Sequence, residues 1–225
     1  MHNAQRNHQR RHFIASAAWL AANVALPLAH AASPAPNAHI LVLGDSLSAE
    51  YGLARGTGWV HLLEQRLARE VPTARVTNAS VSGETTSGGR SRLPALLQQH
   101  RPSVVVIELG GNDALRGLPL QGTQANLLAM TEAAQAAGAR VLLLGMQMPP
   151  NYGRKYSEDF ARLYTQVAQT RKAALLPFFL QGVADHADPT ALFQADRIHP
   201  TAQAQPLMLA NVWPALRPLL PQTKP

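Results

Sequence analysis

Five runs of residues are strand candidates, most of them continuously apolar, and these runs constrain the fold more than any other feature of the chain. They span residues 39–45, 75–80, 103–110, 140–147 and 173–179. Strands covered on both faces have such continuous runs, whereas half-exposed strands alternate apolar and polar residues. Segments long enough for crossover helices follow at residues 58–70, 87–100, 122–137, 155–171 and 201–219. The pattern predicts one α/β domain, with a doubly wound, mainly parallel five-stranded sheet between two layers of helices.

The N-terminal segment differs from this domain in composition. Residues 1–13 contain three arginines and no acidic residue, and an apolar, alanine-rich stretch follows that ends near Ala31. This arrangement is typical of a secretory signal peptide. A membrane-spanning helix is the alternative, but it needs ~20 mostly apolar residues, and Asn23 and Pro27 interrupt this stretch. We therefore expect residues 1–31 to be a cleaved export signal.

The signal peptide defines the expected boundaries and location. We expect residues 32–38 to be a short linker rich in proline and alanine, and residues 39–221 to form the folded domain. The stretch RRHFI also matches the twin-arginine pattern of some bacterial export signals, so the export route stays open. The prediction is a periplasmic or secreted protein with no stable membrane insertion after cleavage.

Charge and cysteine content exclude several classes of protein. The formal charge is +7, and removal of the three arginines of residues 1–31 leaves +4, with no block of like charges. Such a domain is not expected to bind nucleic acid. Because the chain has no cysteine, disulfides, thiol catalysis and thiolate metal sites are excluded. His186 and Asp188 are only a weak indication of a zinc site, and we expect no metal ion. We also expect no cofactor and a monomeric protein.

Small and polar residues follow four of the apolar runs. GDS (44–46) follows the first run, a loop with Gly83 the second and GGND (110–113) the third, while DRIHP (196–200) comes after the fifth. The carboxyl ends of parallel strands meet at one edge of a sheet, where ligands bind. Together the four segments contain a nucleophile, a base, an acid and oxyanion donors, which predicts an acyl-transfer site.

Each of these residues has a specific expected role. The Ser46 hydroxyl is a poor nucleophile at neutral pH and needs an adjacent base, for which His199 is the candidate. Asp196 precedes His199 by three residues, so a turn can bring its carboxylate to the second ring nitrogen. The backbone N–H groups of Ser46 and Gly83 and the side-chain amide of Asn112 can stabilise the charge on a substrate carbonyl oxygen.

The four segments match a known family in order and separation. GDSLS, the Gly83 loop, GGND and the DxxH spacing of Asp196 and His199 resemble the four blocks of the SGNH, or GDSL, hydrolases, over nearly the whole predicted mature chain. ELGGNDALRGLP, PPNYGRKYSEDF and LLPFF are similar to the bacterial periplasmic thioesterase I/lysophospholipase L1 subgroup, also called arylesterase. The resemblance implies a flavodoxin-like three-layer sandwich, a triad of Ser46, Asp196 and His199, and an oxyanion hole of Ser46, Gly83 and Asn112.

One residue departs from the subgroup's pattern. The subgroup often has glycine between the triad acid and the isoleucine, where this chain has Arg197. The guanidinium can narrow the entrance or favour an anionic substrate, or it can simply point to solvent, which is the interpretation we favour.

Two loops contain the candidate substrate-binding residues. The first follows the oxyanion asparagine and the second follows the fourth run, so both are expected beside the site. The candidates are Leu115, Leu118, Leu120, Met148, Pro149 and Tyr152. The alternative for the first loop is a helix entry packed on the core, and for Met148 and its neighbours it is a place in the core itself.

Other polar residues near the motifs are expected to have structural roles. Asp45 precedes the nucleophile and is expected to hydrogen-bond the turn rather than to act as an acid or base. Asp113 is likewise expected to have a structural role rather than to act as an acid or base. His61 and His100 are expected at the surface rather than in a ligand set.

These features together predict a secreted serine esterase that hydrolyses acyl esters and thioesters through an acyl-enzyme. Its substrate is expected to be a small-molecule or lipid acyl ester, of the arylesterase, acyl-CoA thioesterase or lysophospholipase type. Two alternatives remain open, a carbohydrate O-acetylesterase and a non-catalytic lipid-binding module on the same fold. The apolar loops disfavour the first, and the intact catalytic blocks disfavour the second.

Overall fold

A parallel five-stranded sheet forms the centre of the domain in the computed structural model, which describes residues 38–188 and 190–221. Its strands are β1 (His39–Gly44), β2 (Arg75–Asn78), β3 (Val104–Glu108), β4 (Arg140–Leu144) and β5 (Ala174–Leu176). They lie in the order β2-β1-β3-β4-β5, and every neighbouring pair is parallel. The predicted sheet is confirmed. The predicted export signal and most of the linker lie outside the described residues.

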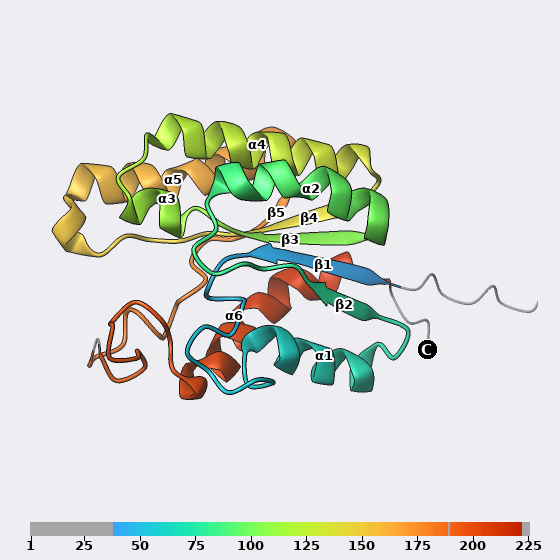
Figure 1. The fold of residues 1–225 in the computed structure, drawn as a ribbon, viewed down its shortest axis with the longest axis horizontal. Helices are drawn as coiled ribbons and strands as arrows, with labels where there is room; N and C mark the ends of the chain where they lie inside the picture. The colour runs from blue at the N-terminus through green and yellow to red at the C-terminus, as the bar shows by residue number, and fades with distance from the viewer. Residues whose placement is uncertain (1–37, 189, 222–225) are drawn as a thin grey trace, which may run out of the picture. The chain divides into compact units, whose positions relative to one another are not determined.

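Helices cover both faces of this sheet (Figure 1). The helices are α1 (Trp59–Glu70), α2 (Thr86–His100), α3 (Gly111–Leu115), α4 (Leu120–Ala136), α5 (Arg154–Arg171) and α6 (Gln205–Leu216). Helices α1 and α6 pack together on one face, while α2, α4 and α5 cover the other. No helix of the described part is long and apolar enough to cross a membrane.

The core explains why the apolar runs show no alternation. Every residue of β1 and β3 is buried, because helices lie over both sheet faces. Val104, Val105, Val106 and Ile107 have no exposed surface, and β-branched side chains of this kind pack well on a pleated sheet.

Two predicted boundaries change because of proline. The expected helix over 201–219 is divided into a 3-10 turn, α6 and a second 3-10 turn at Arg217–Leu219. Pro218 has no N–H to continue the helical hydrogen bonds, so α6 ends before it. The expected strand over 173–179 shortens to Ala174–Leu176, because Pro177 cannot donate a ladder bond.

The order of the strands indicates where along the sheet a ligand site should lie. The sheet reverses its winding direction between β1 and β3, which are neighbours although β2 lies between them in sequence. In parallel sheets, ligands bind at the carboxyl ends of the strands beside this reversal. These ends point to the left in Figure 1, where α3 and the orange-red segment before α6 lie.

Candidate active site

Ser46, His199 and Asp196 form a continuous chain of hydrogen bonds. Ser46 lies in the turn directly after β1, and its Oγ lies 2.9 Å from His199 Nε2. His199 Nδ1 lies 2.7 Å from Asp196 Oδ2. Since a carboxylate can only accept, Nδ1 carries the proton and Nε2 is free to accept from the Ser46 hydroxyl. The structure brings together the three residues that the sequence singles out.

Local hydrogen bonds fix the Asp196 carboxylate. Its Oδ1 accepts from the backbone N–H groups of Ile198 and His199, at 2.9 and 3.0 Å. The hydrogen bond to the His199 side chain, followed by these two backbone bonds, lowers the pKa of Asp196 to about 2. The carboxylate is therefore ionised wherever a histidine base can work.

Arg197 occupies the tight turn between the acid and the base. Its φ is 58°, in the left-handed region that favours glycine. This conformation gives a physical reason for the glycine that the resembling subgroup often has there. The residue is exposed, which agrees with a guanidinium that points to solvent.

Tyr51 and Gln194 also contact the histidine loop, and the sequence motifs gave no indication of either. The Tyr51 ring lies 4.3 Å from the His199 ring, centroid to centroid, and is half exposed. Gln194 Nε2 donates to the backbone carbonyl groups of Tyr51 and Pro200, at 2.9 and 3.1 Å. The Gln194 N–H donates to the His199 carbonyl at 2.7 Å. These contacts hold the histidine loop against the turn after β1.

The loops with Gly83 and Asn112 lie at the same edge of the sheet. The Val81 N–H donates to the Gly44 carbonyl at 3.0 Å, which brings the Gly83 loop beside the end of β1. Gly83 has a φ of 78°, and its carbonyl accepts from Arg116 Nη2 at 2.9 Å. Asn112 Nδ2 donates to Asp45 Oδ2 at 2.9 Å. The two predicted oxyanion donors therefore belong to segments bonded to β1 and to the Ser46 turn.

Asp45 has the hydrogen-bonding position expected from the sequence. It is buried, and its Oδ1 accepts from the Leu47 N–H at 3.0 Å. Burial raises its pKa to about 6, although the Leu47 N–H and the side chains of Glu108 and Asn112 lower it. Glu108, which ends β3, was missed by sequence reasoning, and the only signal for it was a charged residue at the end of an apolar run.

Asp113 is buried and connects three helices. It accepts from the Thr86 N–H at 2.8 Å, from the Thr86 hydroxyl and from the Thr123 hydroxyl at 3.2 Å. Thr86 begins α2 and Thr123 lies in α4, so the carboxylate joins both helices to α3. Its role in the structure is to position these elements.

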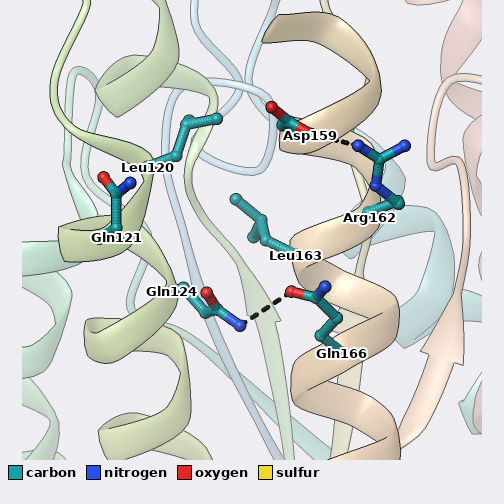
Figure 2. A pocket seen from close by; sticks show the side chains of 7 residues that line it. All are labelled: Leu120, Gln121, Gln124, Asp159, Arg162, Leu163 and Gln166. Carbon is teal, nitrogen blue, oxygen red and sulfur yellow. Dashed lines mark hydrogen bonds and ion pairs between the residues drawn. The ribbon is translucent and has the colours of Figure 1, made fainter. Parts of the chain in front are cut away.

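The structure does not bring the six candidate substrate residues together. Leu115, Leu118 and Tyr152 are exposed, with 38 to 40% of each residue accessible, whereas Met148 is buried in the core. Pro149 is exposed. Leu120 lines a hollow between α4 and α5, as Figure 2 shows, where Gln124 Nε2 donates to Gln166 Oε1 at 2.9 Å. Met148 fits a place in the core and Leu120 fits a helix entry packed on the core, because each packs against the core. Both agree with these alternatives better than with a role in substrate binding.

Among the residues that the structure describes, no group of three His, Asp or Glu side chains could hold a metal ion. His186 is exposed, and its Nδ1 hydrogen-bonds the backbone of Asp188. His61 pairs with Glu64 on the surface of α1, as expected for a surface residue.

A glycine at the end of β1 allows the Ser46 turn to pack against β3. A Cβ at Gly44 would lie 2.8 Å from both Glu108 Oε2 and Ser48 Oγ. We expect Gly44→Ala to lower the free energy of unfolding by about 2 kcal/mol, because overpacking of a buried site typically costs 1–3 kcal/mol. Gly122→Ala is the control: it lies in α4 with open space around it, and alanine should stabilise the helix by up to about 1 kcal/mol. Urea unfolding of both variants measures the difference, and equal midpoints would contradict the close packing.

The hydrogen-bonded chain of Ser46, His199 and Asp196 is the arrangement of nucleophile, base and acid that characterises serine hydrolases, here at the carboxyl edge of a parallel sheet. A family model described as the GDSL-like Lipase/Acylhydrolase family matches residues 42–206. The chain belongs to this family, and it is therefore an enzyme, a serine hydrolase of ester bonds.

Two relatives and one solved structure show how similar the chain is to other proteins. It is 55% identical to Esterase TesA of Pseudomonas aeruginosa over 181 residues, which are 80% of this chain and 89% of the relative. It is 41% identical to Thioesterase 1/protease 1/lysophospholipase L1 of Escherichia coli K12, covering 80% of this chain and 84% of the relative. A crystal structure of TesA superposes with a TM-score of 0.78 at 55% identity, covering 81% of this chain and 99% of that one.

Proposed function

We propose that the protein is a secreted serine esterase that cleaves acyl esters and thioesters through an acyl-enzyme intermediate. The single observation that carries the proposal is the hydrogen-bonded chain from Ser46 Oγ through His199 to Asp196. Its order of nucleophile, base and orienting acid is the one that acyl transfer requires.

The geometry supports a two-step reaction. Ser46 Oγ attacks the carbonyl carbon, and its proton passes to His199 Nε2, while Asp196 stabilises the imidazolium that forms. The Ser46 and Gly83 N–H groups and the Asn112 amide stabilise the oxyanion. His199 then gives the proton to the leaving oxygen or sulfur, and the acyl group stays on Ser46. A water molecule deprotonated by His199 releases the acid and restores the serine.

Exposed apolar side chains on the segments after β3 and β4 favour an acyl chain over a sugar. Leu115, Leu118 and Tyr152 are exposed on the segments that follow β3 and β4. The names of the relatives include esterase, thioesterase and lysophospholipase, and the sequence also resembles the arylesterases. We therefore propose a broad acyl specificity of this type, on small-molecule or lipid esters. No cofactor takes part in this mechanism.

The location of the enzyme follows from the predicted export signal. We propose that residues 1–31 direct export and that the mature enzyme acts as a monomer in the periplasm or outside the cell. N-terminal sequencing of the protein recovered from the periplasm of an expressing bacterium tests this, with a start near residue 32 as the expected result.

Hydrolysis of p-nitrophenyl esters from acetyl to palmitoyl tests the substrate class. We expect kcat/KM to rise at least about tenfold from acetyl to a medium chain, since each buried methylene contributes about 0.8 kcal/mol. Leu118→Ser should reduce this rise more than it reduces acetyl hydrolysis. Activity confined to the acetyl ester would favour an O-acetylesterase instead, and absence of any hydrolysis would favour a binding module.

A further inference from the structure

Two carboxyl groups lie buried beneath the Ser46 turn, and the proposed reaction steps use neither of them. Asp45 is 3% exposed and Glu108 is 1% exposed. Glu108 is the register partner of Gly44 across β1 and β3, which places its side chain under the turn. Its Oε2 accepts from the Asp45 N–H at 3.2 Å and from the Ser48 hydroxyl at 2.8 Å. Ser48 Oγ in turn accepts from Trp59 Nε1 at 3.1 Å.

The described residues provide no lysine or arginine that compensates the charge of this pair. Within residues 38–188 and 190–221, no lysine or arginine forms an ion pair with Asp45 or Glu108. Two adjacent carboxylates without a cation cannot both stay ionised in a buried site. The pair therefore retains one proton at neutral pH.

The hydrogen bonds indicate which carboxyl group keeps that proton. Asp45 accepts on both oxygens, from the Leu47 N–H on Oδ1 and from Asn112 Nδ2 on Oδ2. In the described structure, the hydrogen bonds to Glu108 end on Oε2 alone, which leaves Oε1 to carry a proton. Burial and the nearby Asp45 charge raise the pKa of Glu108 well above its usual range. The negative charge therefore resides on Asp45.

Two other titratable side chains face the pair. His199, from the loop before α6, favours the charged form of Asp45. Tyr164, from α5, lies near both carboxyl groups, but its hydroxyl donates to the Leu109 carbonyl at 2.9 Å. Neither group replaces Glu108 as a neutral donor beside Asp45.

The charge on Asp45 determines how the Asn112 amide is oriented. Asn112 Nδ2 has two N–H groups, and Asp45 Oδ2 accepts one of them. The other N–H is then directed away from Asp45 and is available to a substrate oxygen. An amide without this acceptor is free to rotate and present its oxygen, which cannot stabilise an oxyanion.

We propose that Glu108 is a positioning residue: it stays protonated, donates a hydrogen bond to Asp45, and so keeps Asp45 ionised as the acceptor that orients the Asn112 amide. This inference rests on the oxyanion role proposed for Asn112. It also predicts an acid-sensitive site, because a second proton on the pair removes the negative charge that makes Asp45 a strong acceptor for the Asn112 amide. The second proton binds as the pH falls through about 6, where Asp45 titrates.

A matched pair of variants tests the proposal. The side-chain amide introduced by Glu108→Gln offers an N–H₂ to Asp45 and an oxygen to Ser48, as protonated glutamic acid does. Its kcat and the acid limb of its pH profile should therefore stay within about twofold of the wild type. Glu108→Leu removes the donor. Its kcat should fall about tenfold with little change in KM, and its acid limb should move to higher pH. Equal losses in the two variants, or an unchanged Glu108→Leu enzyme, would refute the positioning role.

Infrared spectroscopy provides a readout that does not depend on activity or on the folding of Glu108→Leu. A protonated carboxylic acid has a carbonyl stretch distinct from that of a carboxylate. The wild type at pH 7 should show this band and Glu108→Gln should lack it, while Asp113→Asn, which changes another buried carboxylate, should retain it. A wild type without the band contradicts the proposal. A Ser46→Ala enzyme that kept its activity would instead reject the proposed function and leave the band in place.

Discussion

Replacing Ser46 with alanine is expected to lower kcat/KM for ester hydrolysis by about 10⁴-fold or more. The Ser46 hydroxyl donates to His199 Nε2 over 2.9 Å, and alanine has no atom that can attack the carbonyl carbon. In serine hydrolases, loss of the nucleophile typically costs 10⁴ to 10⁶ in kcat, because the remaining groups only polarise the substrate. The fold should not change, since the side chain is small and only partly buried.

Ser87→Ala is the matched control for this experiment. Ser87 is exposed in α2, so its hydroxyl can be removed without an effect on the site. Both variants are measured on the same p-nitrophenyl ester and labelled with a fluorophosphonate, which should modify the wild type and Ser87→Ala but not Ser46→Ala. If the activity of Ser46→Ala stayed within tenfold of the wild type, the result would contradict a mechanism with Ser46 as the nucleophile.

The fold could be predicted from the sequence because burial on both faces leaves a clear pattern. The runs that form β1 and β3 are continuous and apolar, and helix-length segments separate them, so few other arrangements are compatible with them. Local exceptions could not be predicted from that pattern. Helix α3 has five residues at Gly111–Leu115, too few to show a helical period, and proline effects changed the ends of β5 and α6.

The site could be predicted where the reacting groups lie in short motifs after strands. Ser46 and His199 are 153 residues apart, yet both lie at the carboxyl edge because parallel strands end there. Glu108, Tyr51 and Gln194 could not be predicted, since their roles depend on contacts between segments distant in sequence. Glu108 in particular contacts Asp45 only because β1 and β3 are neighbours in register.

The substrate residues were the least predictable part, because residues close in sequence need not lie on the same side. Leu118 and Leu120 are two residues apart, yet Leu118 is exposed in the loop while Leu120 packs at the start of α4. Met148 follows β4 but is buried. An apolar loop beside a site thus contains both candidate ligand contacts and ordinary core residues, and exposure separates them.

Replacing Asp196 with asparagine is expected to lower kcat by about 10³- to 10⁴-fold with little change in KM. Asparagine Oδ1 can still accept from the backbone N–H groups of Ile198 and His199, which bond the native carboxylate at 2.9 and 3.0 Å. Its N–H₂ group would then face His199 Nδ1, where the native Oδ2 lies 2.7 Å away. Two donors cannot face each other, so the ring would carry its proton on Nε2.

That tautomer explains the size of the expected loss. With a proton on Nε2, His199 cannot accept the Ser46 proton, although every side chain stays in place. The pKa of Asp196 is about 2, so the wild-type carboxylate stays charged down to about that pH and adds no acid limb near neutrality.

Asp188→Asn is the control, since this exposed aspartate in the same loop accepts from Thr190 and should keep full activity. If Asp196→Asn retained more than a tenth of the wild-type kcat, another group would have to orient His199, and the half-exposed Tyr51 ring at 4.3 Å would be the first to replace.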